Sequence, residues 1–138
     1  MSEQNKAVVR RIVEDHWNKK NPALIGELFA TNCAFHTPDG ALQGEDGARQ
    51  LYNAYATAFP DFSLRTDDIL ADGNKVVVRY TFAGTHKGPL ATVPASGKQA
   101  TVQGIAIFRL AGGKADEVRF VWDKFALMQQ IGVLAPIA

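Results

Sequence analysis

Two long stretches of alternating apolar and polar residues constrain the fold of this chain most. They span Lys75–His86 and Lys98–Leu110, and a shorter stretch, Glu117–Asp123, follows the second after Gly112-Gly113. Alternation with a period of two residues is typical of β-strands, and a glycine pair between two such runs is typical of a hairpin. The second half of the chain therefore predicts an antiparallel sheet.

Two further segments extend the predicted sheet. Phe62–Ala71 alternates more loosely and leads into the next strand through turn residues at 72–74. Cys33–Thr37 is a short strand that ends at Pro38. The segment Lys87–Gly97 between the two long strands is rich in proline and glycine, so we expect an exposed loop that could serve as a lid.

Helical periodicity dominates the first 60 residues. An amphipathic helix is predicted over residues 5–20, a short one over 22–29 with Asn21 as its N-cap, and a third over Glu45–Phe59, which Pro60 ends. Helices that precede a block of strands predict the α+β class, with the helices packed on one face of the sheet. We expect a cone-shaped α+β barrel whose open end forms a pocket.

Length and charge limit the function. A chain of 138 residues predicts a single domain over residues 1–138, and its net charge of +1 argues against nucleic-acid and membrane partners. The polar N-terminus lacks the apolar region of a secretory signal, and Cys33 is the only cysteine, which predicts a cytoplasmic protein without disulfides.

Asp123 is the main catalytic candidate because it ends a strand beside aromatic residues. Two interpretations are open: it caps the helix that starts at Lys124, or it is a general acid/base that faces a cavity. On the strand it shares a face with Glu117 and Arg119, whereas the more apolar face carries Val118, Phe120 and Trp122. Either the polar face lines the cavity, where Arg119 would lower the pKa of Asp123, or a bulge turns the aspartate inward.

The three histidines are further candidates. His86, at the end of a strand, is either a hydrogen-bond donor at the pocket rim or a structural strand-end residue. His36, before a turn, either serves the site or satisfies backbone groups. His16, on the apolar stripe of the first helix, is either a site residue or a hydrogen-bonded core histidine. Their spacing matches no metal site, so neither a metal nor another cofactor is expected. Pocket-wall or core positions are expected for five aromatic residues, Trp17, Tyr52, Tyr55, Phe59 and Trp122.

Several short segments follow one another in a characteristic order. They are Phe59-Pro60-Asp61-Phe62, Gly84-Thr85-His86-Lys87-Gly88, the Pro94–Gly97–Lys98 turn, Gly104–Arg109, and Asp123 with Gln130 and Gly132. In order and spacing they resemble the SnoaL-like polyketide cyclases, or ester cyclases, of the nuclear transport factor 2-like superfamily, over residues 5–133. The resemblance implies a cone-shaped barrel and a cofactor-free intramolecular aldol closure of a polyketide ester.

The resemblance also implies roles for single residues. The acid/base aspartate of the family falls on Asp123, the histidine of its Gly-Thr-His element on His86, and another common histidine position on His36. One departure concerns the tryptophan that often precedes the aspartate by four residues. Arg119 stands there in this chain, and a tryptophan appears at Trp122 instead.

These observations predict a cofactor-independent enzyme that acts on a hydrophobic, oxygenated small molecule, with Asp123 as acid/base, His86 assisting, and Arg119 near the substrate. Apolar residues on both faces of Lys75–His86 suggest a homodimer through the outer face of the sheet. Two alternatives remain open. One is an isomerase or epoxide hydrolase of the same superfamily, and the other is a non-catalytic binding or interaction module.

Overall fold

The computed structural model describes residues 2–135 and confirms the α+β architecture. The helical segments are α1 (Ser2–Arg11), the π-helix η1 (Ile12–Asn18), the 3-10 turn η2 (Pro22–Leu24), α2 (Ile25–Leu28), α3 (Gly44–Ala58) and α4 (Lys124–Gln130). None of these helices is long and apolar enough to cross a membrane.

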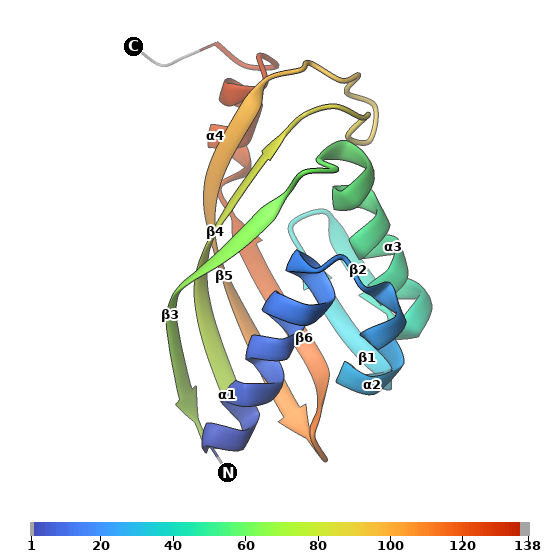
Figure 1. The fold of residues 1–138 in the computed structure, drawn as a ribbon, viewed down its shortest axis with the longest axis vertical. Coiled ribbons are helices and arrows are strands. Elements are labelled where there is room, and N and C mark those ends of the chain that lie inside the picture. Colours follow the sequence, from blue (N-terminus) through green and yellow to red (C-terminus); the bar gives the residue numbers. More distant parts are fainter. Residues whose placement is uncertain (1, 136–138) are drawn as a thin grey trace.

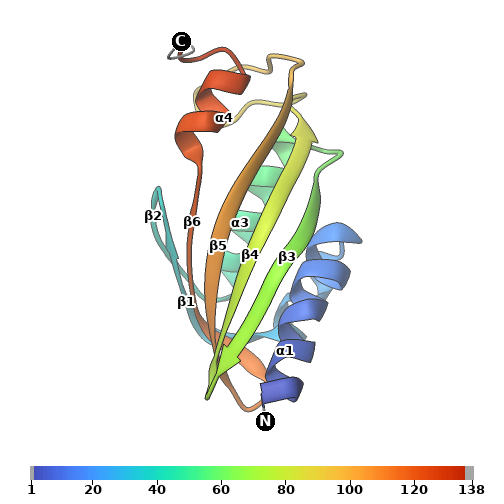
Figure 2. The same ribbon diagram turned by 90° about the vertical axis from the view of Figure 1, so that its left-hand side faces the viewer.

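Six strands form one curled sheet. They are β1 (Phe29–Thr37), β2 (Gly40–Gln43), β3 (Ser63–Asp72), β4 (Lys75–Thr85), β5 (Gln99–Ala111) and β6 (Lys114–Trp122), in the spatial order β2-β1-β6-β5-β4-β3. All neighbours are antiparallel except β1 and β6, which run parallel. The sheet is curled without closing, and α1 and α3 cover its concave face (Figures 1 and 2).

The structure differs from the sequence expectation mainly around the first strand. β1 begins at Phe29, so it takes the residue at which the second helix was expected to end. The short strand β2 was not predicted, because four residues are too few to show alternation. It pairs with β1 through a turn in which Thr37 Oγ1 donates to the Gly40 carbonyl at 2.8 Å.

The first predicted helix is continuous, but it changes from an α-helix to a π-helix along its length. After α1, residues Ile12–Asn18 form a π-helix, which turns more widely than an α-helix and often occurs at functional sites. The end of η1 is fastened to the edge strand β3. The Asn18 side chain exchanges two hydrogen bonds of 2.7 Å with the backbone of Leu64, and Lys20 Nζ donates to the Phe62 carbonyl at 2.8 Å.

One glycine gives space to the two largest side chains on the concave face. Gly104 of β5 pairs with Tyr80 of β4 on one side and with Trp122 of β6 on the other. A Cβ atom at position 104 would lie 2.5 Å from Tyr80 Oη and 2.9 Å from Trp122 Cβ. The absence of a side chain at Gly104 therefore lets both rings lie across the sheet.

We predict that Gly104→Ala destabilises the protein and moves the Tyr80 ring. Overpacking of this kind costs about 1–3 kcal/mol, more than the gain from replacing a glycine in a strand. The free energy of unfolding in urea measures the cost. Gln103→Ala, on the exposed face of the same strand, is the control and should change it by less than about 0.5 kcal/mol. Equal stability of the two variants would contradict this packing.

Candidate functional site

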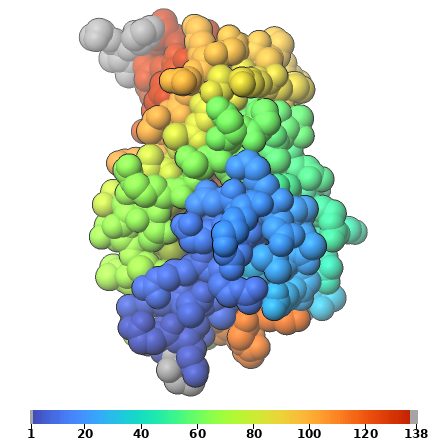
Figure 3. All heavy atoms as spheres, in the orientation of Figure 1, coloured from blue at the N-terminus to red at the C-terminus, as the bar shows by residue number. Residues whose placement is uncertain are grey.

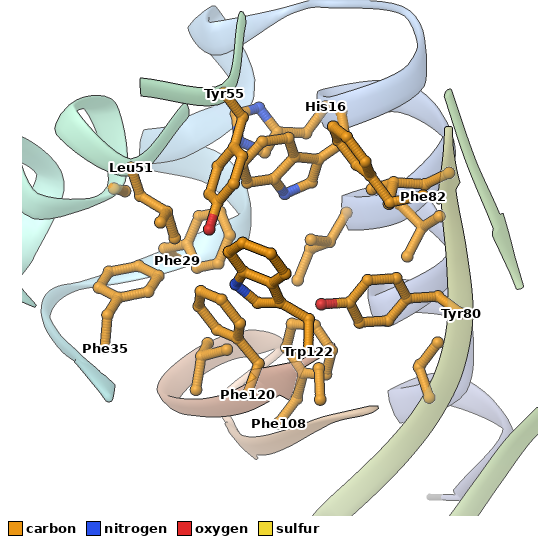
Figure 4. A pocket seen from close by; sticks show the side chains of 18 residues that line it. His16, Phe29, Phe35, Leu51, Tyr55, Tyr80, Phe82, Phe108, Phe120 and Trp122 are labelled. Carbon is orange, nitrogen blue, oxygen red and sulfur yellow. The ribbon is translucent and has the colours of Figure 1, made fainter. Parts of the chain in front are cut away.

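A cavity of about 100 Å³ lies between the concave face of the sheet and the helices that cover it. Figure 4 shows that its wall consists mostly of aromatic and aliphatic side chains. In Figure 3 the N-terminal helical segment, in blue, covers the middle and lower part of the visible face. The lining residues come from both layers: Ile12, Val13, His16, Trp17, Phe29, Phe35, Ala48, Leu51, Tyr55, Leu64, Val78, Tyr80, Phe82, Ala106, Phe108, Val118, Phe120 and Trp122.

The π-helix supplies the part of the wall that lies above the sheet. Ile12, Val13, His16 and Trp17 all line the cavity, two adjacent pairs separated by one turn. The wide π-turn brings side chains five residues apart, such as Ile12 and Trp17, above one another, so this helix presents a broader face than an α-helix does. The second half of the apolar stripe predicted for the first helix therefore forms part of the cavity wall.

The terminal strand places its apolar face toward the cavity. Val118, Phe120 and Trp122 line it, whereas Val121 on the opposite face is 66% exposed. The strand alternates regularly here, and no bulge turns the following residue inward. Neither of the two arrangements considered from the sequence is therefore found. The polar face of this strand does not line the cavity, and no bulge turns Asp123 toward it.

His16 is the one imidazole in the cavity wall. Its Nδ1 lies 3.1 Å from the Asn21 carbonyl oxygen, which can only accept, so Nδ1 carries the proton and Nε2 is left with a free lone pair. The side chain is 1% exposed, and this burial lowers its pKa, an effect that the hydrogen bond to Asn21 partly offsets. The neutral imidazole therefore predominates near pH 7.

Two phenol groups and one indole N–H add hydrogen-bond donors. The hydroxyls of Tyr55, from α3, and Tyr80, from β4, both point into the cavity in Figure 4. Burial is the main cause that raises the pKa of each tyrosine, so both stay protonated. Nε1 of Trp122 is buried and has no hydrogen-bond partner among the described residues. The cavity wall therefore carries three hydrogen-bond donors, the two hydroxyls and the indole N–H.

No carboxylate, ammonium or guanidinium group lines the cavity in the described part of the chain. A charged ligand would lose its hydration there without gaining a counter-ion, which is costly in an apolar surrounding. The wall is thus suited to an uncharged molecule with an aromatic or unsaturated skeleton.

Asp123 lies outside this cavity. It is exposed at the surface, and its Oδ1 accepts the Ala126 N–H at 2.9 Å, which makes it the N-cap of α4. The structure thus shows the capping role that was one of the two sequence interpretations. Its carboxylate is absent from the cavity wall because the inward positions of β6 end at Trp122. Catalysis by Asp123 in this cavity would require the cap to break.

His86 lies beneath the loop that follows β4 and does not line the cavity. It is fully buried, and its Nδ1 accepts the Ser96 N–H at 3.2 Å and lies 2.9 Å from Ser96 Oγ. Phe59 packs against its ring with centroids 5.4 Å apart. The expected position at a pocket rim is therefore wrong for this cavity. The loop over Lys87–Gly97 contributes no lining residue either, so η1 covers the cavity in the place of that lid.

The remaining substrate-binding candidates divide between wall, core and surface. Trp17 and Trp122 line the cavity, and Tyr52 is a core residue that packs behind Trp17 with ring centroids 5.5 Å apart. His36 and Arg119 lie on the convex side, where both approach Glu117, His36 Nε2 at 3.5 Å. The sheet separates these two residues from the cavity, so direct contact with its ligand is excluded in this conformation.

Residues 2–135 contain neither a cluster of metal ligands nor an exposed cysteine. No group of three or more His, Cys, Asp or Glu side chains in this range is arranged to hold a metal ion. Cys33 is buried, and burial with nearby Asp116 and Glu117 raises its pKa to about 12, so it is not a nucleophile at neutral pH.

Sequence reasoning missed the two tyrosine hydroxyls as site groups. Tyr55 was expected in the core or the wall without a role for its hydroxyl, and Tyr80 was not among the candidates. The available signal was a polar tip on an otherwise apolar face, because a buried tyrosine usually finds a partner for its hydroxyl. Which of these tips meet in space depends on the packing of α3 against the sheet.

The curled sheet covered by helices defines the nuclear transport factor 2-like class of α+β domains. Within it the chain belongs to the SnoaL-like polyketide cyclase family, whose family model matches residues 7–131. A search of curated proteins finds no match.

Solved structures of similar fold cover nearly the whole chain. A protein of Jannaschia sp. CCS1, named as a candidate SnoaL-like polyketide cyclase, is 25% identical with a TM-score of 0.89, over 98% of this chain and 94% of its own. TsrD of Streptomyces laurentii is 26% identical with a TM-score of 0.86, over 96% and 97%. AclR of Streptomyces galilaeus, named as a candidate hydroxylase, is 23% identical with a TM-score of 0.88, over 100% and 87%, and shows the fold alone.

We predict that Asp123 acts on stability through its cap. Asp123→Ala should lower the free energy of unfolding by about 1 kcal/mol, because the Ala126 N–H loses its acceptor, whereas Asp123→Asn should be nearly neutral, since asparagine caps as well. Urea denaturation of both variants measures this difference. A cost as large for asparagine as for alanine would show that the charge, and not the cap, matters.

Proposed function

We propose that this protein is a cofactor-independent enzyme that binds an uncharged, hydrophobic, oxygenated small molecule in the cavity and removes a proton from a carbon next to its carbonyl group. The enolate carbon then attacks a second carbonyl group of the same molecule, which is an intramolecular aldol-type ring closure. The new C–C bond forms as the π bond of that carbonyl opens, and the resulting alkoxide takes back the proton that the base removed. Membership of the SnoaL-like polyketide cyclase family supports this class of reaction. The observation that carries the proposal is a neutral, buried imidazole in an otherwise apolar wall.

His16 serves as the base. The Asn21 carbonyl holds the Nδ1 proton, so Nε2 is the nitrogen that can take a proton from the ligand. Burial that lowers the pKa of His16 keeps most of the imidazole unprotonated at neutral pH. The wall excludes bulk water from the reacting atoms, so the proton leaves and returns through Nε2 of His16.

This assignment moves the base from Asp123 to His16. Asp123 is the aspartate to which the family resemblance points, but its carboxylate is exposed and engaged in capping α4. The two assignments make opposite predictions for single variants, so one experiment distinguishes them.

We predict that the protein accelerates hydrogen–deuterium exchange at the benzylic carbon of phenylacetone in D2O, followed by proton NMR. His16→Asn keeps a donor for the Asn21 carbonyl but removes the base, and should lower the catalysed rate about a hundredfold. The native rate should fall with pH only below the usual histidine pKa of about 6.5, because the pKa of His16 is lowered and the neutral form is the active one.

Asp123→Asn is the matched control and should keep the exchange rate within about twofold, because it keeps the cap. Loss of exchange in Asp123→Asn with retention in His16→Asn would restore the aspartate as the base. Absence of any acceleration by the native protein would overturn enolisation and favour a non-catalytic binding protein of the same fold.

We propose in addition that two copies pair through the convex face of the sheet. Ile105 and Val121 are cross-strand partners on this face and are 44% and 66% exposed, and Ile107 lies beside them at 39%. Such a contiguous apolar strip on adjacent central strands is unusual for a surface that stays in water. An interface of this kind places the same patch of both copies in contact, as a two-fold axis requires.

We predict that Ile105→Lys gives a monomer, because each copy then buries an unpaired charge in the contact. Sedimentation velocity over a range of protein concentrations measures the change. Phe125→Lys is the control, since Phe125 is 50% exposed on α4 and lies outside the sheet. Identical sedimentation of the native protein and Ile105→Lys would exclude this interface.

A further inference from the structure

The indole N–H of Trp122 is a buried donor that makes no hydrogen bond of good geometry, although it is close enough to the Tyr55 hydroxyl to offset part of the rise in the pKa of that group. Nε1 has no hydrogen-bond partner among the described residues, although Trp122 lies in the cavity wall. A buried donor without a partner costs about as much free energy as a lost hydrogen bond. A ligand that supplies an acceptor to this N–H would recover that free energy on binding. The cavity is the space from which an acceptor can reach it.

A second donor lies on the same side of the cavity. Figure 4 shows the Tyr55 hydroxyl and the Trp122 nitrogen facing the same region, and the two rings meet edge to face with centroids 6.1 Å apart. The Tyr80 hydroxyl approaches Trp122 from the other side in the same view. Two donors that converge on one point can hold a single carbonyl oxygen, and they hold it more strongly when it becomes an enolate oxygen.

The position of the tryptophan in the strand is decisive for this arrangement. Trp122 stands on the inward face of β6, three residues after Arg119, which points to the convex side and pairs with Glu117. Gly104 leaves the room that the indole and the Tyr80 ring need above β5. A tryptophan at position 119 would present its N–H on the opposite face of the sheet.

We propose that Trp122 Nε1–H and the Tyr55 hydroxyl together hold the carbonyl oxygen of the ligand, and that the cavity selects uncharged carbonyl compounds over both hydrocarbons and carboxylates. The inference rests on the proposed function for the identity of the cavity as the ligand site. It adds the residues that orient the ligand, with its oxygen toward Trp122 and Tyr55 and its acidic carbon left to His16.

Three probes of nearly equal shape test the selection. They are phenylacetone, its methylene counterpart 2-methyl-3-phenylpropene, and the phenylacetate anion. Trp17 and Trp122 are the only two tryptophans, so the protein gives two indole N–H signals in a nitrogen-15 NMR spectrum, and Trp122→Phe assigns them. Titration of each probe gives both the affinity and the shift of each indole proton.

With phenylacetone we expect the Trp122 indole proton to move downfield, and the methylene probe should bind without that shift. Trp122→Phe and Tyr55→Phe should each weaken phenylacetone binding roughly five- to tenfold, the range of one lost hydrogen bond in a buried site, while the methylene probe changes by less than about twofold. Phenylacetate should not bind measurably. Tyr52→Phe is the control for loss of a hydroxyl, since Tyr52 does not line the cavity, and should change both affinities by less than about twofold.

Equal losses for phenylacetone and the methylene probe in Trp122→Phe would reduce the tryptophan to a shape-filling residue and overturn the inference. Binding of phenylacetate, or of none of the probes, would also overturn it. The test needs no proton transfer, so its outcome is independent of the exchange assay. Loss of exchange in His16→Asn therefore reports on the proposed function, and unchanged ketone binding in Trp122→Phe counts against this inference alone.

Discussion

Burial of the apolar side chains on the concave face of the sheet organises the molecule, because exposing them to water would cost free energy. Alternation along β4, β5 and β6 sends Val78, Phe108 and Phe120 to the same side, so a layer of helices must cover them. The π-helix η1 and α3 provide this cover. Because large rings from both layers meet at an angle, they leave space between them, and that space is the cavity. Core and site are therefore continuous, and both depend on the same alternation.

A cavity built in this way imposes its own chemistry. Its wall has no charged group in the described residues, so any base must be neutral when free, and imidazole is the side chain that meets this condition near pH 7. The hydrogen bond from His16 to Asn21 fixes the tautomer, and burial lowers the pKa of the ring. Protonated tyrosines and an indole N–H complement a carbonyl oxygen without adding charge. Acid–base chemistry is thus possible here without a carboxylate.

The fold was predictable from the sequence to a large extent, and the site only in part. The strand from Phe62 and the helix from Glu45 were each placed within one residue of β3 and α3, because period-two and period-3.6 patterns are strong there. His16 and Trp17 were candidates from their place on an apolar stripe. The assignment of Asp123 to a cavity failed as geometry, because parity along β6 directs Trp122 inward and leaves the following aspartate at the mouth of α4.

The sequence by itself determined the α+β class, most element positions and the two possible faces of the terminal strand, since these depend on local periodicity. It also showed that the tryptophan which the family often has four residues before the aspartate is absent at position 119, and that a tryptophan stands at position 122. Only the tertiary structure decided which face of the sheet is covered, because that depends on how distant helices pack on it. That packing brings Tyr55, Trp122 and His16, from three separate elements, around one space. Their proximity is a property of long-range contacts, which no local pattern in the chain encodes.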